Sequence, residues 1–459
     1  YMEDMKNGKR SSFSGKLGYV LAAAGASVGL GNIWRFPYLA AKYGGGIFLI
    51  IYIVLALTFG YTMIVAETAI GRMTRKSPVG AFKSFGKKKW LSFGGWINAV
   101  IPVLIVPYYS VIGGWVIKYL VEYFRGNAKQ LAEDGYFTDF ISNGVSTELC
   151  FVAFCAFTLI IIFAGVQNGI ERVSKIMMPI LIVLSVIIAV YSVTRPGALA
   201  GVKYFLVPNV KNFSWMTVVS AMGQMFYSLS IAMGILITFG SYMKKDTAIE
   251  DSTRNVEVFD TGIAIMAGLM IIPAVFAFSG GDPDTLQAGP SLMFITIPKV
   301  FQNMGFGTVI GIVFFLLVLF AAVTSSIALT ESAVSTFEDE LGWGRKKATV
   351  LVGVIMLALG SLSSLGYGPL AGIKIIGMQF LDLFDFLTNS VMMPIAALLT
   401  SLLVSRVVGI DKIEDEIIHG ESAFRRKKVF VVMIKYLCPV FAIIILLSSV
   451  ANALGWIKM

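Results

Sequence analysis

The stretch Gly25-Ala-Ser-Val-Gly-Leu-Gly-Asn32 lies in the middle of an apolar segment, residues 17–41, that is otherwise long enough to form one continuous helix. Three glycines within seven residues destabilise a helix at this point, so we expect the backbone to open there. A second long apolar segment, residues 215–243, is interrupted in the same way at Ser228-Leu-Ser-Ile-Ala-Met-Gly234. A pair of interrupted membrane-spanning segments is the sequence feature that best indicates a transport site.

The composition of the 459 residues is that of a protein embedded in lipid. Hydrophobic residues make up 57% of the chain, charged residues make up 14%, and the mean hydropathy is +0.80, whereas soluble domains contain about 25% charged residues. Because about 20 apolar residues are needed to cross the hydrocarbon layer, we predict an all-α polytopic membrane protein with about eleven transmembrane helices, over residues 17–41, 44–70, 91–122, 149–164, 169–194, 215–243, 256–279, 307–337, 348–364, 377–405 and 429–455.

Lysine and arginine are concentrated in a subset of the loops, and this distribution indicates the orientation in the membrane. Basic clusters precede the first span and follow the second, sixth, eighth and tenth spans, whereas the segment 123–148 contains Glu133, Asp134, Asp139 and Glu148. We therefore predict a multi-pass protein of the inner (plasma) membrane with a cytoplasmic N-terminus. The net charge of +10 follows from this topology and does not indicate nucleic-acid binding. A short helix is expected within residues 280–306, across the outer face, where it would act as a lid.

Residues that are usual in enzyme active sites are scarce. The one histidine, His419, lies in a charged loop, and the three cysteines lie in or beside apolar spans without metal-ligand spacing, so we assign none of them a role. The segment Gly25-Ala-Ser-Val-Gly29 fits the G-x-S-x-G pattern of hydrolase nucleophiles, but that pattern requires a strand-to-helix turn and a general base. We therefore expect no enzymatic activity.

An opened helix inside a membrane exposes backbone N–H and C=O groups, which are tolerated only where they are buried in protein or line a cavity. Half-helix N-termini attract a carboxylate, and freed carbonyls bind an alkali cation or an ammonium group. A zwitterionic amino acid together with a cation would satisfy both kinds of group. The alternative for residues 25–29 is a helix-packing face of small residues, and the alternative for Thr324-Ser-Ser326 is hydrogen bonding between helices.

Four strings distinguish this chain: Gly25-Ala-Ser-Val-Gly-Leu-Gly-Asn-Ile-Trp-Arg-Phe-Pro37, Gly44-Gly-Gly46, Gly223-Gln-Met-Phe-Tyr-Ser-Leu-Ser230 and Thr324-Ser-Ser326. They resemble the neurotransmitter:sodium symporter family, in its bacterial branch of eleven-helix amino-acid transporters, and the match runs along nearly the whole chain. The resemblance implies one transmembrane domain, 1–459. In it an inverted repeat of five plus five spans, about 14–195 and about 212–406, with broken helices one and six, is followed by a peripheral helix at about 429–455.

The resemblance implies two sodium ions. The first would be bound by the substrate carboxylate and by oxygen atoms of Ser27, Asn32, Ser228 and Asp260. The second would link the first span to the eighth through the carbonyls of Gly25, Val28 and Ala321 and the hydroxyls of Thr324 and Ser325.

Asp260 lies inside the seventh predicted span, where an ionisable residue is costly and is functional by default. Chloride-dependent members of the family have asparagine at this position and need a chloride ion nearby to balance two sodium ions. Here the aspartate supplies the negative charge, and Ala264 stands at the position of the chloride-coordinating serine. The resemblance therefore implies no chloride requirement.

The resemblance also implies the substrate contacts. The substrate carboxylate would meet the N–H groups of Leu30 and Gly31 and the hydroxyl of Tyr109, and its ammonium group would meet carbonyls of Ser27, Tyr227, Ser228 and Ser230. The substrate side chain would contact Ile105, Tyr109, Tyr227, Met233, Ser325 and Leu329. This set carries no charge to pair with a charged substrate, which favours a neutral apolar amino acid. Ala232 replaces the glycine of most members, and its methyl group would favour a small-to-medium substrate.

Two ion pairs match the gates of the family. The outer gate would consist of Arg35 and Asp385 with Tyr227 as an aromatic lid, and the inner gate of Arg10 and Asp339. In the fifth span Gly169 is followed by Pro179, so we predict that its cytoplasmic half can unwind and release the second sodium ion.

The sequence therefore predicts a sodium-coupled symporter that moves a neutral, hydrophobic, small-to-medium amino acid into the cell by alternating access. The alternatives are a sodium-coupled carrier of another small zwitterion or amine, a substrate-gated channel, and a non-transporting amino-acid sensor.

Overall fold

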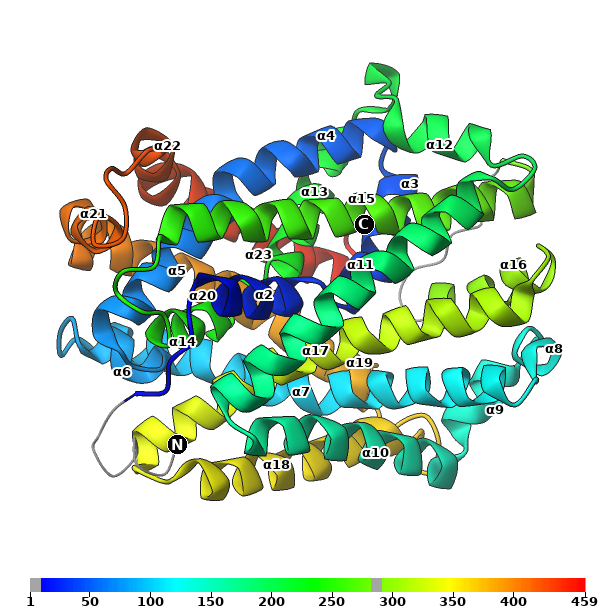
Figure 1. Cartoon of the computed structure of the whole chain (residues 1–459), viewed down its shortest axis with the longest axis horizontal. Helices are drawn as coiled ribbons and strands as arrows, with labels where there is room; N and C mark the ends of the chain where they lie inside the picture. Colours follow the sequence, from blue (N-terminus) through cyan, green and yellow to red (C-terminus); the bar gives the residue numbers. More distant parts are fainter. Residues whose placement is uncertain (1–9, 282–290, 459) are drawn as a thin grey trace.

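The computed structural model describes residues 10–281 and 291–458. These residues form helices joined by short loops, and their only β-type pairing is an isolated bridge between Ile375 and Met378. Figure 1 shows the long helices running side by side along the longest axis of the molecule. This arrangement confirms the predicted all-α class.

Nine helices in the described part of the chain are long and apolar enough to cross a membrane, and a bent pair of helices at the start makes a tenth span. The nine are α4–η2–α5 (Gly46–Thr74), α7 (Lys89–Phe124), α10 (Gly144–Phe163), η3–α11 (Val166–Val193), α15 (Ile249–Ser279), α17 (Gly307–Leu341), α18 (Arg345–Leu365), α19–η7–α20–η8 (Phe380–Val408) and α22–η9–α23 (Lys427–Ala453). The sixth predicted span, 215–243, is present as two short helices, α13 (Trp215–Ser228) and α14 (Ile235–Ser241). Each predicted span therefore has a helical counterpart.

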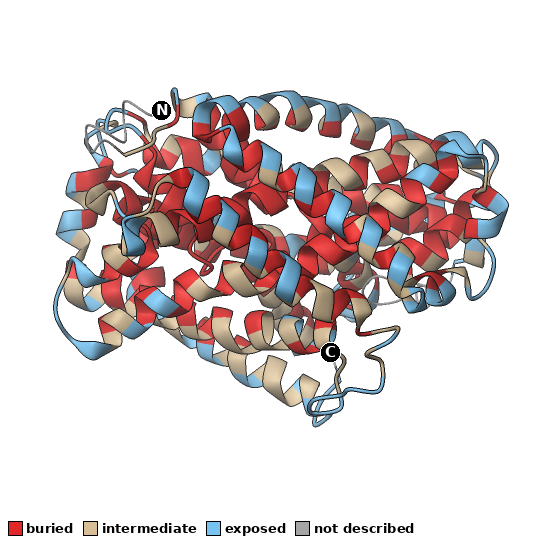
Figure 2. Ribbon diagram, turned by 90° about the horizontal axis from the view of Figure 1, so that it is seen from below, coloured by how far each residue is buried: buried red, intermediate tan, exposed pale blue. Residues whose placement is uncertain are grey.

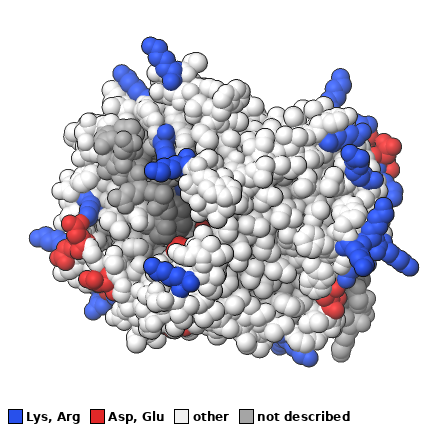
Figure 3. All heavy atoms as spheres, turned by 180° about the vertical axis from the view of Figure 1, so that it is seen from behind, with Lys and Arg blue, Asp and Glu red and all other residues white. Residues whose placement is uncertain are grey.

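The central and peripheral spans differ in how much of their surface is covered by protein. In the most apolar stretch of α7, 78% of the residues are buried, against 33% in the last span, Lys427–Ala453. Figure 2 shows buried residues through the middle of the bundle and exposed ones on its outer helix faces. On the face seen in Figure 3, most charged side chains lie toward the two ends and a broad uncharged zone separates them, as expected of a surface that contacts lipid.

The first span is broken where the glycine cluster predicts. Helix α2 (Lys16–Ser27) ends before Gly29, and the chain resumes as a π-type turn, η1 (Gly31–Arg35), followed by α3 (Phe36–Lys42). A Cβ atom on Gly31 would lie 2.5 Å from Cε1 of Tyr227, so only glycine permits this approach of the first broken span to the sixth.

The second break, between α13 and α14, contains two non-glycine residues with positive φ angles. They are Ser230 at 56° and Ala232 at 60°, and Gly234 follows at 77°. Non-glycine residues adopt this left-handed conformation rarely, and such positions cluster at functional sites. The Ser230 hydroxyl donates to the carbonyl of Ala26 at 2.8 Å, which joins the two breaks directly.

Short helices lie at the ends of the spans. They include η6 (Leu292–Thr296) and α16 (Ile297–Gln302), which fall within the region 280–306 where a short helix was predicted; residues 282–290 of the predicted lid lie outside the described residues. The others are α6 (Pro78–Lys83), α8 (Ala128–Leu131), α9 (Tyr136–Ser142), α12 (Leu199–Leu206), η4 (Val210–Asn212) and α21 (Ile410–Ile417).

The first half of the fifth span, predicted to be cytoplasmic, is helical in this structure. It begins with the π-type turn η3 (Val166–Glu171) and continues as α11 (Arg172–Val193), with Pro179 inside the helix. The buried Glu171 accepts a hydrogen bond from the backbone N–H of Ser14 at 3.0 Å and pairs with Lys175 at 2.9 Å. These contacts hold the segment closed against the start of the first span, so its unwinding stays a prediction.

Candidate functional site

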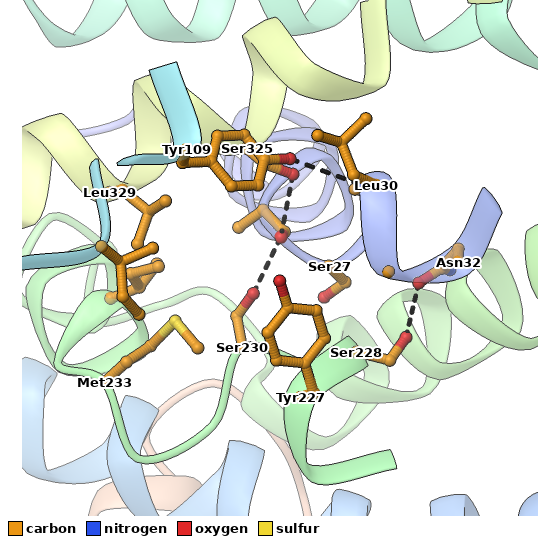
Figure 4. A pocket seen from close by; sticks show the side chains of 15 residues that line it. Ser27, Leu30, Asn32, Tyr109, Tyr227, Ser228, Ser230, Met233, Ser325 and Leu329 are labelled. Atoms are coloured by element: carbon orange, nitrogen blue, oxygen red, sulfur yellow. Dashed lines mark hydrogen bonds between the residues drawn. The ribbon is translucent and has the colours of Figure 1, made fainter. Parts of the chain in front are cut away.

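A small cavity of about 40 Å³ lies between the two broken spans, against α7 and α17. It is lined by the residues drawn in Figure 4: Ala26, Ser27, Gly29, Leu30, Gly31, Asn32, Ile105, Tyr109, Tyr227, Ser228, Ser230, Met233, Ile235, Ser325 and Leu329. All the predicted substrate contacts except Ala232 are in this set. No Lys, Arg, Asp or Glu among the described residues lines the cavity.

The cavity has a polar end and an apolar end. At the polar end, the backbone N–H of Leu30 donates to the Tyr109 hydroxyl at 3.3 Å, at the start of the half-helix that follows the first break. Backbone N–H groups at a helix N-terminus together with a phenolic hydroxyl suit a carboxylate. Met233 and Leu329 lie on the opposite side of the cavity in Figure 4. The arrangement therefore fits a molecule with a charged head and an apolar tail.

Ala232 does not line the cavity, and this corrects the prediction that its methyl group limits substrate size. The residue is fully buried, and its backbone N–H donates to Oε1 of Glu67 at 3.0 Å. Its φ angle is positive, at 60°, within the second break. Glu67 was not predicted as a site residue, although an acidic residue inside an apolar span indicates a functional position.

Three side chains predicted for the first sodium site lie together and share hydrogen bonds. The Ser228 hydroxyl is 2.6 Å from Oδ1 of Asp260 and 2.7 Å from Oδ1 of Asn32, and Nδ2 of Asn32 donates to Asp260 at 3.1 Å. The Tyr52 hydroxyl donates to the other Asp260 oxygen at 2.7 Å. Asp260 has no exposed surface, and no described basic residue forms an ion pair with it. Tyr52 was missed because a tyrosine in an apolar span gives no distinct signal.

The oxygen atoms predicted for the second sodium site also converge. The Ser325 hydroxyl lies 3.0 Å from the carbonyl oxygen of Gly25 and 3.4 Å from that of Val28. The Thr324 hydroxyl lies 3.1 Å from the carbonyl oxygen of Ala321 within α17. All five oxygens belong to neutral hydroxyl and carbonyl groups, and the contacts of Ser325 with Gly25 and Val28 connect the first broken span to α17. Among the described residues no group of three or more His, Cys, Asp and Glu side chains could hold a metal ion, so both clusters depend on oxygen donors of mixed kind.

The predicted inner pair is in direct contact. Nη1 of Arg10 lies 2.5 Å from Oδ1 of Asp339, and Nη2 of Arg10 donates to the hydroxyls of Ser241 and Ser335 at 2.9 Å each. Phe13 is only 1% exposed and packs edge-on against the rings of Tyr19, Phe239 and Tyr242. The path is therefore closed at this end.

The predicted outer pair differs, because no ion pair between Arg35 and Asp385 is formed within the described structure. The Arg35 guanidinium lies over the ring of Tyr227 at 5.2 Å, and Asp385 accepts hydrogen bonds from Tyr108, at 3.2 Å, and from Asn389. Both residues line an outer cavity of about 420 Å³ that reaches Tyr109 and Tyr227. The two charges stay apart because this cavity lies between them and each already has a local partner.

Comparisons with known proteins agree with this geometry. The family model of the sodium:neurotransmitter symporter family matches residues 10–134 and 121–456. An uncharacterized sodium-dependent transporter of Bacillus subtilis, YhdH, is 34% identical over 97% of this chain and 99% of its own length. The human sodium- and chloride-dependent GABA transporter 2 is 26% identical over 89% of this chain and 75% of its own length.

The fold also matches a solved structure. The crystal structure of MhsT in complex with L-phenylalanine superposes with a TM-score of 0.85, at 34% identity over 96% of this chain and all of that one. The chain therefore belongs to the sodium:neurotransmitter symporter family, and it is a multi-pass sodium-dependent transporter and not an enzyme.

Proposed function

We propose that this chain uses the inward sodium gradient to take up a neutral, apolar amino acid by alternating access. The observation that carries the proposal is the carboxylate of Asp260, which is fully buried beside the substrate cavity and has three hydrogen-bond donors but no described basic partner. A buried charge without a counter-ion is costly. A bound cation at this point would provide the missing positive charge.

Coupling follows from the position of this carboxylate cluster. Asn32 and Ser228 belong both to the cluster and to the lining of the cavity. A substrate carboxylate at the polar end would therefore complete the coordination of a cation held by Asp260. Each ligand then binds more tightly when the other is present, which is the thermodynamic basis of symport.

We further propose two sodium ions per substrate and no requirement for chloride. The second cluster, between α2 and α17, offers the carbonyls of Gly25 and Val28 with the Ser325 hydroxyl. Two sodium ions add two positive charges and a zwitterionic substrate adds no net charge, so the buried Asp260 carboxylate supplies a compensating negative charge that an anion would otherwise provide. Ala264, one helical turn further along α15, is fully buried and has no group that could bind chloride.

The lining of the cavity supports an apolar substrate side chain. Ile105, Met233 and Leu329 contribute apolar side chains to the lining, and a charged substrate side chain would be buried beside them without a partner at a cost of several kcal/mol. MhsT binds L-phenylalanine, which supports the same class of substrate. Because Ala232 does not limit the cavity, the proposed range includes large apolar side chains.

The proposed orientation places the N-terminus and the Arg10–Asp339 pair on the cytoplasmic side of the plasma membrane. The basic loops that adjoin this end of the bundle support it, since positively charged loops remain in the cytoplasm. With the Arg10–Asp339 end closed and a cavity at the Arg35–Asp385 end, the structure corresponds to a state that receives substrate from outside. The repeat boundaries near 195 and 212 remain part of this proposal.

The test is uptake of radiolabelled neutral amino acids into proteoliposomes with and without an inward sodium gradient. Accumulation above the outside concentration, dependent on the gradient, would support a symporter. Equilibration without accumulation would indicate a substrate-gated channel, and binding without uptake would indicate a sensor. Sodium-driven uptake of amines or other small zwitterions, with no amino acid transported, would overturn the proposed substrate class.

A further inference from the structure

Two adjoining cavities lie on the outer face of α15, away from the substrate path. The first, of about 410 Å³, is lined by residues at the start of α15 and of the segment that joins α21 to α22: Ala248, Glu250, Asp251, Arg254, Gly420, Glu421, Ser422, Arg425 and Arg426. The second, of about 420 Å³, lies between α2 and α15 and is lined by Lys16, Leu17, Val20, Asn255, Val258 and Phe259. Figure 1 shows the start of α15 at the same end of the molecule as α21 and α22.

The linings of the two cavities are joined by an ion pair along one face of the helix. Asp251 lines the first cavity, and its carboxylate pairs with Lys16 of the second. Arg254 of the first is followed in the chain by Asn255 of the second. The positions 251, 254, 255 and 258 follow the spacing of a single helix face. We name the face of α15 that carries positions 251, 254, 255 and 258, together with the two cavities along it, the α15 groove.

The lining of the α15 groove changes from charged to apolar at about the depth where the headgroup region of a membrane gives way to hydrocarbon. Helix α15 has 31 residues and is about 46 Å long, whereas the hydrocarbon layer is about 30 Å thick. Its first turns therefore extend into the headgroup region, and Val258, about 10 Å deeper than Asp251, lies within the hydrocarbon. Leu17 and Val258 are 60% and 65% exposed, so the deeper cavity offers apolar side chains to lipid.

Most charges of the first cavity already have partners within the described structure. Glu250 accepts the backbone N–H groups of Arg425 and Arg426 at 2.6 and 3.2 Å, and Arg254 pairs with Asp251 at 2.5 Å. The Arg426 guanidinium pairs with Glu257 at 3.0 Å. These groups shape the cavity and leave little free charge of their own.

Two groups of opposite charge remain. Oε1 of Glu421 accepts the backbone N–H of Asp251 at 2.9 Å, but Oε2 is buried and has no hydrogen-bond partner. The exposed Arg425 guanidinium makes no ion pair or hydrogen bond with any described residue. Burial and the nearby charge of Glu250 raise the pKa of Glu421 above its ordinary value, although the positive charges of Arg425 and Arg72 act in the opposite direction. The first cavity therefore offers Oε2 of Glu421 as a free hydrogen-bond acceptor and the Arg425 guanidinium as a cation without a paired anion.

We infer that the α15 groove binds a phospholipid with a primary-amine headgroup, phosphatidylethanolamine. Its phosphate would pair with Arg425, its ammonium group would donate to Oε2 of Glu421, and an acyl chain would lie along Leu17 and Val258. The trimethylammonium group of phosphatidylcholine has no N–H to donate. Phosphatidylglycerol has no cationic group to donate to Glu421. The inference requires only the membrane-spanning fold and is independent of the proposed substrate.

The test uses the full-length protein, delipidated in detergent and titrated with dioleoyl phosphatidylethanolamine, phosphatidylcholine or phosphatidylglycerol, with bound lipid counted by native mass spectrometry. We expect phosphatidylethanolamine to bind about tenfold more tightly than either of the others, a difference within the range of one hydrogen bond to a charged group. Arg425→Gln and Glu421→Gln should each remove this preference. Lys428→Gln removes an exposed charge three residues further along that does not line the groove, and it should change nothing.

Val258→Trp should fill the deeper cavity and weaken all three lipids by a similar factor. Equal affinity for the three lipids on the unmodified protein would overturn the inference, and so would tighter binding of phosphatidylglycerol, since it would mean that Arg425 alone acts. A preference that persists in both Arg425→Gln and Glu421→Gln would also overturn it. The comparison of the three lipids on the unmodified protein tests the inference even if a variant fails to fold.

Discussion

The two candidate cation clusters lie on either side of the same opened segment, yet they differ in charge. The cluster at Asp260 contains a fully buried carboxylate held by three donors, whereas the cluster at Ser325 contains hydroxyl and backbone carbonyl groups only. A cation at Asp260 would neutralise a buried charge, and one at Ser325 would bring a new charge into a neutral site. We therefore expect the first cluster to dominate sodium affinity and the second to be the weaker site.

The two cation clusters also differ in the spans that they connect. The Asp260 cluster joins the first, sixth and seventh spans and shares Asn32 and Ser228 with the substrate cavity. The Ser325 cluster joins α2 to α17 without sharing Asp260. The first cluster is suited to couple the ion to the substrate, and the second to hold two helices of the bundle together until the ion leaves.

Asp260→Ala tests the charged cluster and should have the largest effect. Removing the carboxylate leaves Asn32, Ser228 and Tyr52 without their acceptor and leaves a bound cation without its counter-charge. Loss of one partner from a buried ionic contact costs about 3–5 kcal/mol, so we expect sodium-dependent binding and uptake to be abolished. Asn32→Ala should act in the same direction. Asp139→Ala removes an exposed carboxylate on α9 and serves as the matched control.

Sodium-dependent uptake that persists in Asp260→Ala would show that the carboxylate is not an ion ligand. A companion measurement replaces chloride with gluconate in the uptake assay of the unmodified protein. Because Asp260 supplies the negative charge, the uptake rate should not change. A large loss in gluconate would contradict the charge argument directly.

Gly31→Ala tests the polar end of the substrate cavity. A Cβ atom there would lie 2.5 Å from Cε1 of Tyr227, so the lid or the half-helix must move. We expect amino-acid binding to weaken by about 10- to 100-fold, since misplaced contacts in such a site cost about 1–3 kcal/mol. Gly262→Ala is the matched control, because a Cβ atom at Gly262 has no neighbour within 4 Å. Unchanged affinity in Gly31→Ala would mean that the Tyr227 lid does not approach the substrate.

Ser325→Ala tests the neutral cluster, where the expected effect is smaller. The substitution removes one hydroxyl ligand but no charge, and a single hydrogen-bonding group contributes about 0.5–1.5 kcal/mol. The sodium concentration for half-maximal binding should rise by up to about tenfold, without loss of coupling. Thr336→Ala, in the same helix, removes a hydroxyl that bonds only to the carbonyl of Ser332 and should leave the sodium dependence as it was. Abolished binding in Ser325→Ala alone would reverse the proposed order of the two clusters.

The two helix breaks could be predicted from the sequence, because glycine destabilises a helix at its own position and the length of an apolar segment is a property of that segment alone. Three glycines inside residues 17–41 predicted the end of α2 to within a few residues, and the membrane imposes the length of every span. The partners of Asp260 were readable only through resemblance, since Asn32 and Ser228 are far from it in the chain. Tyr52 and Glu67 were missed because each acts through tertiary contacts that no spacing reveals.

The outer pair and Ala232 show the limit of transferring roles by position. The sequence places Arg35 and Asp385 where a gate is expected, but whether they touch depends on the conformational state, and here a cavity separates them. The direction in which the Ala232 methyl group points depends on a positive φ angle that a non-glycine residue rarely adopts. Residue propensities therefore could not predict the conformation of Ala232.

Ala232→Gly should have the smallest effect of these changes, because the methyl group lies outside the cavity. The backbone N–H that donates to Glu67 is kept, so the second break should hold its shape. An L-residue in the left-handed region costs about 1–2 kcal/mol, and glycine costs about 0.4–1 kcal/mol through the freedom of the unfolded chain. The free energy of unfolding should therefore rise by about 1 kcal/mol or less, while phenylalanine and alanine keep their relative potency as competitors within about twofold. Met233→Ala, which enlarges the cavity itself, should change that ratio by about tenfold. A tenfold gain for phenylalanine in Ala232→Gly would mean that the methyl group does reach the substrate and that the second break turns the other way.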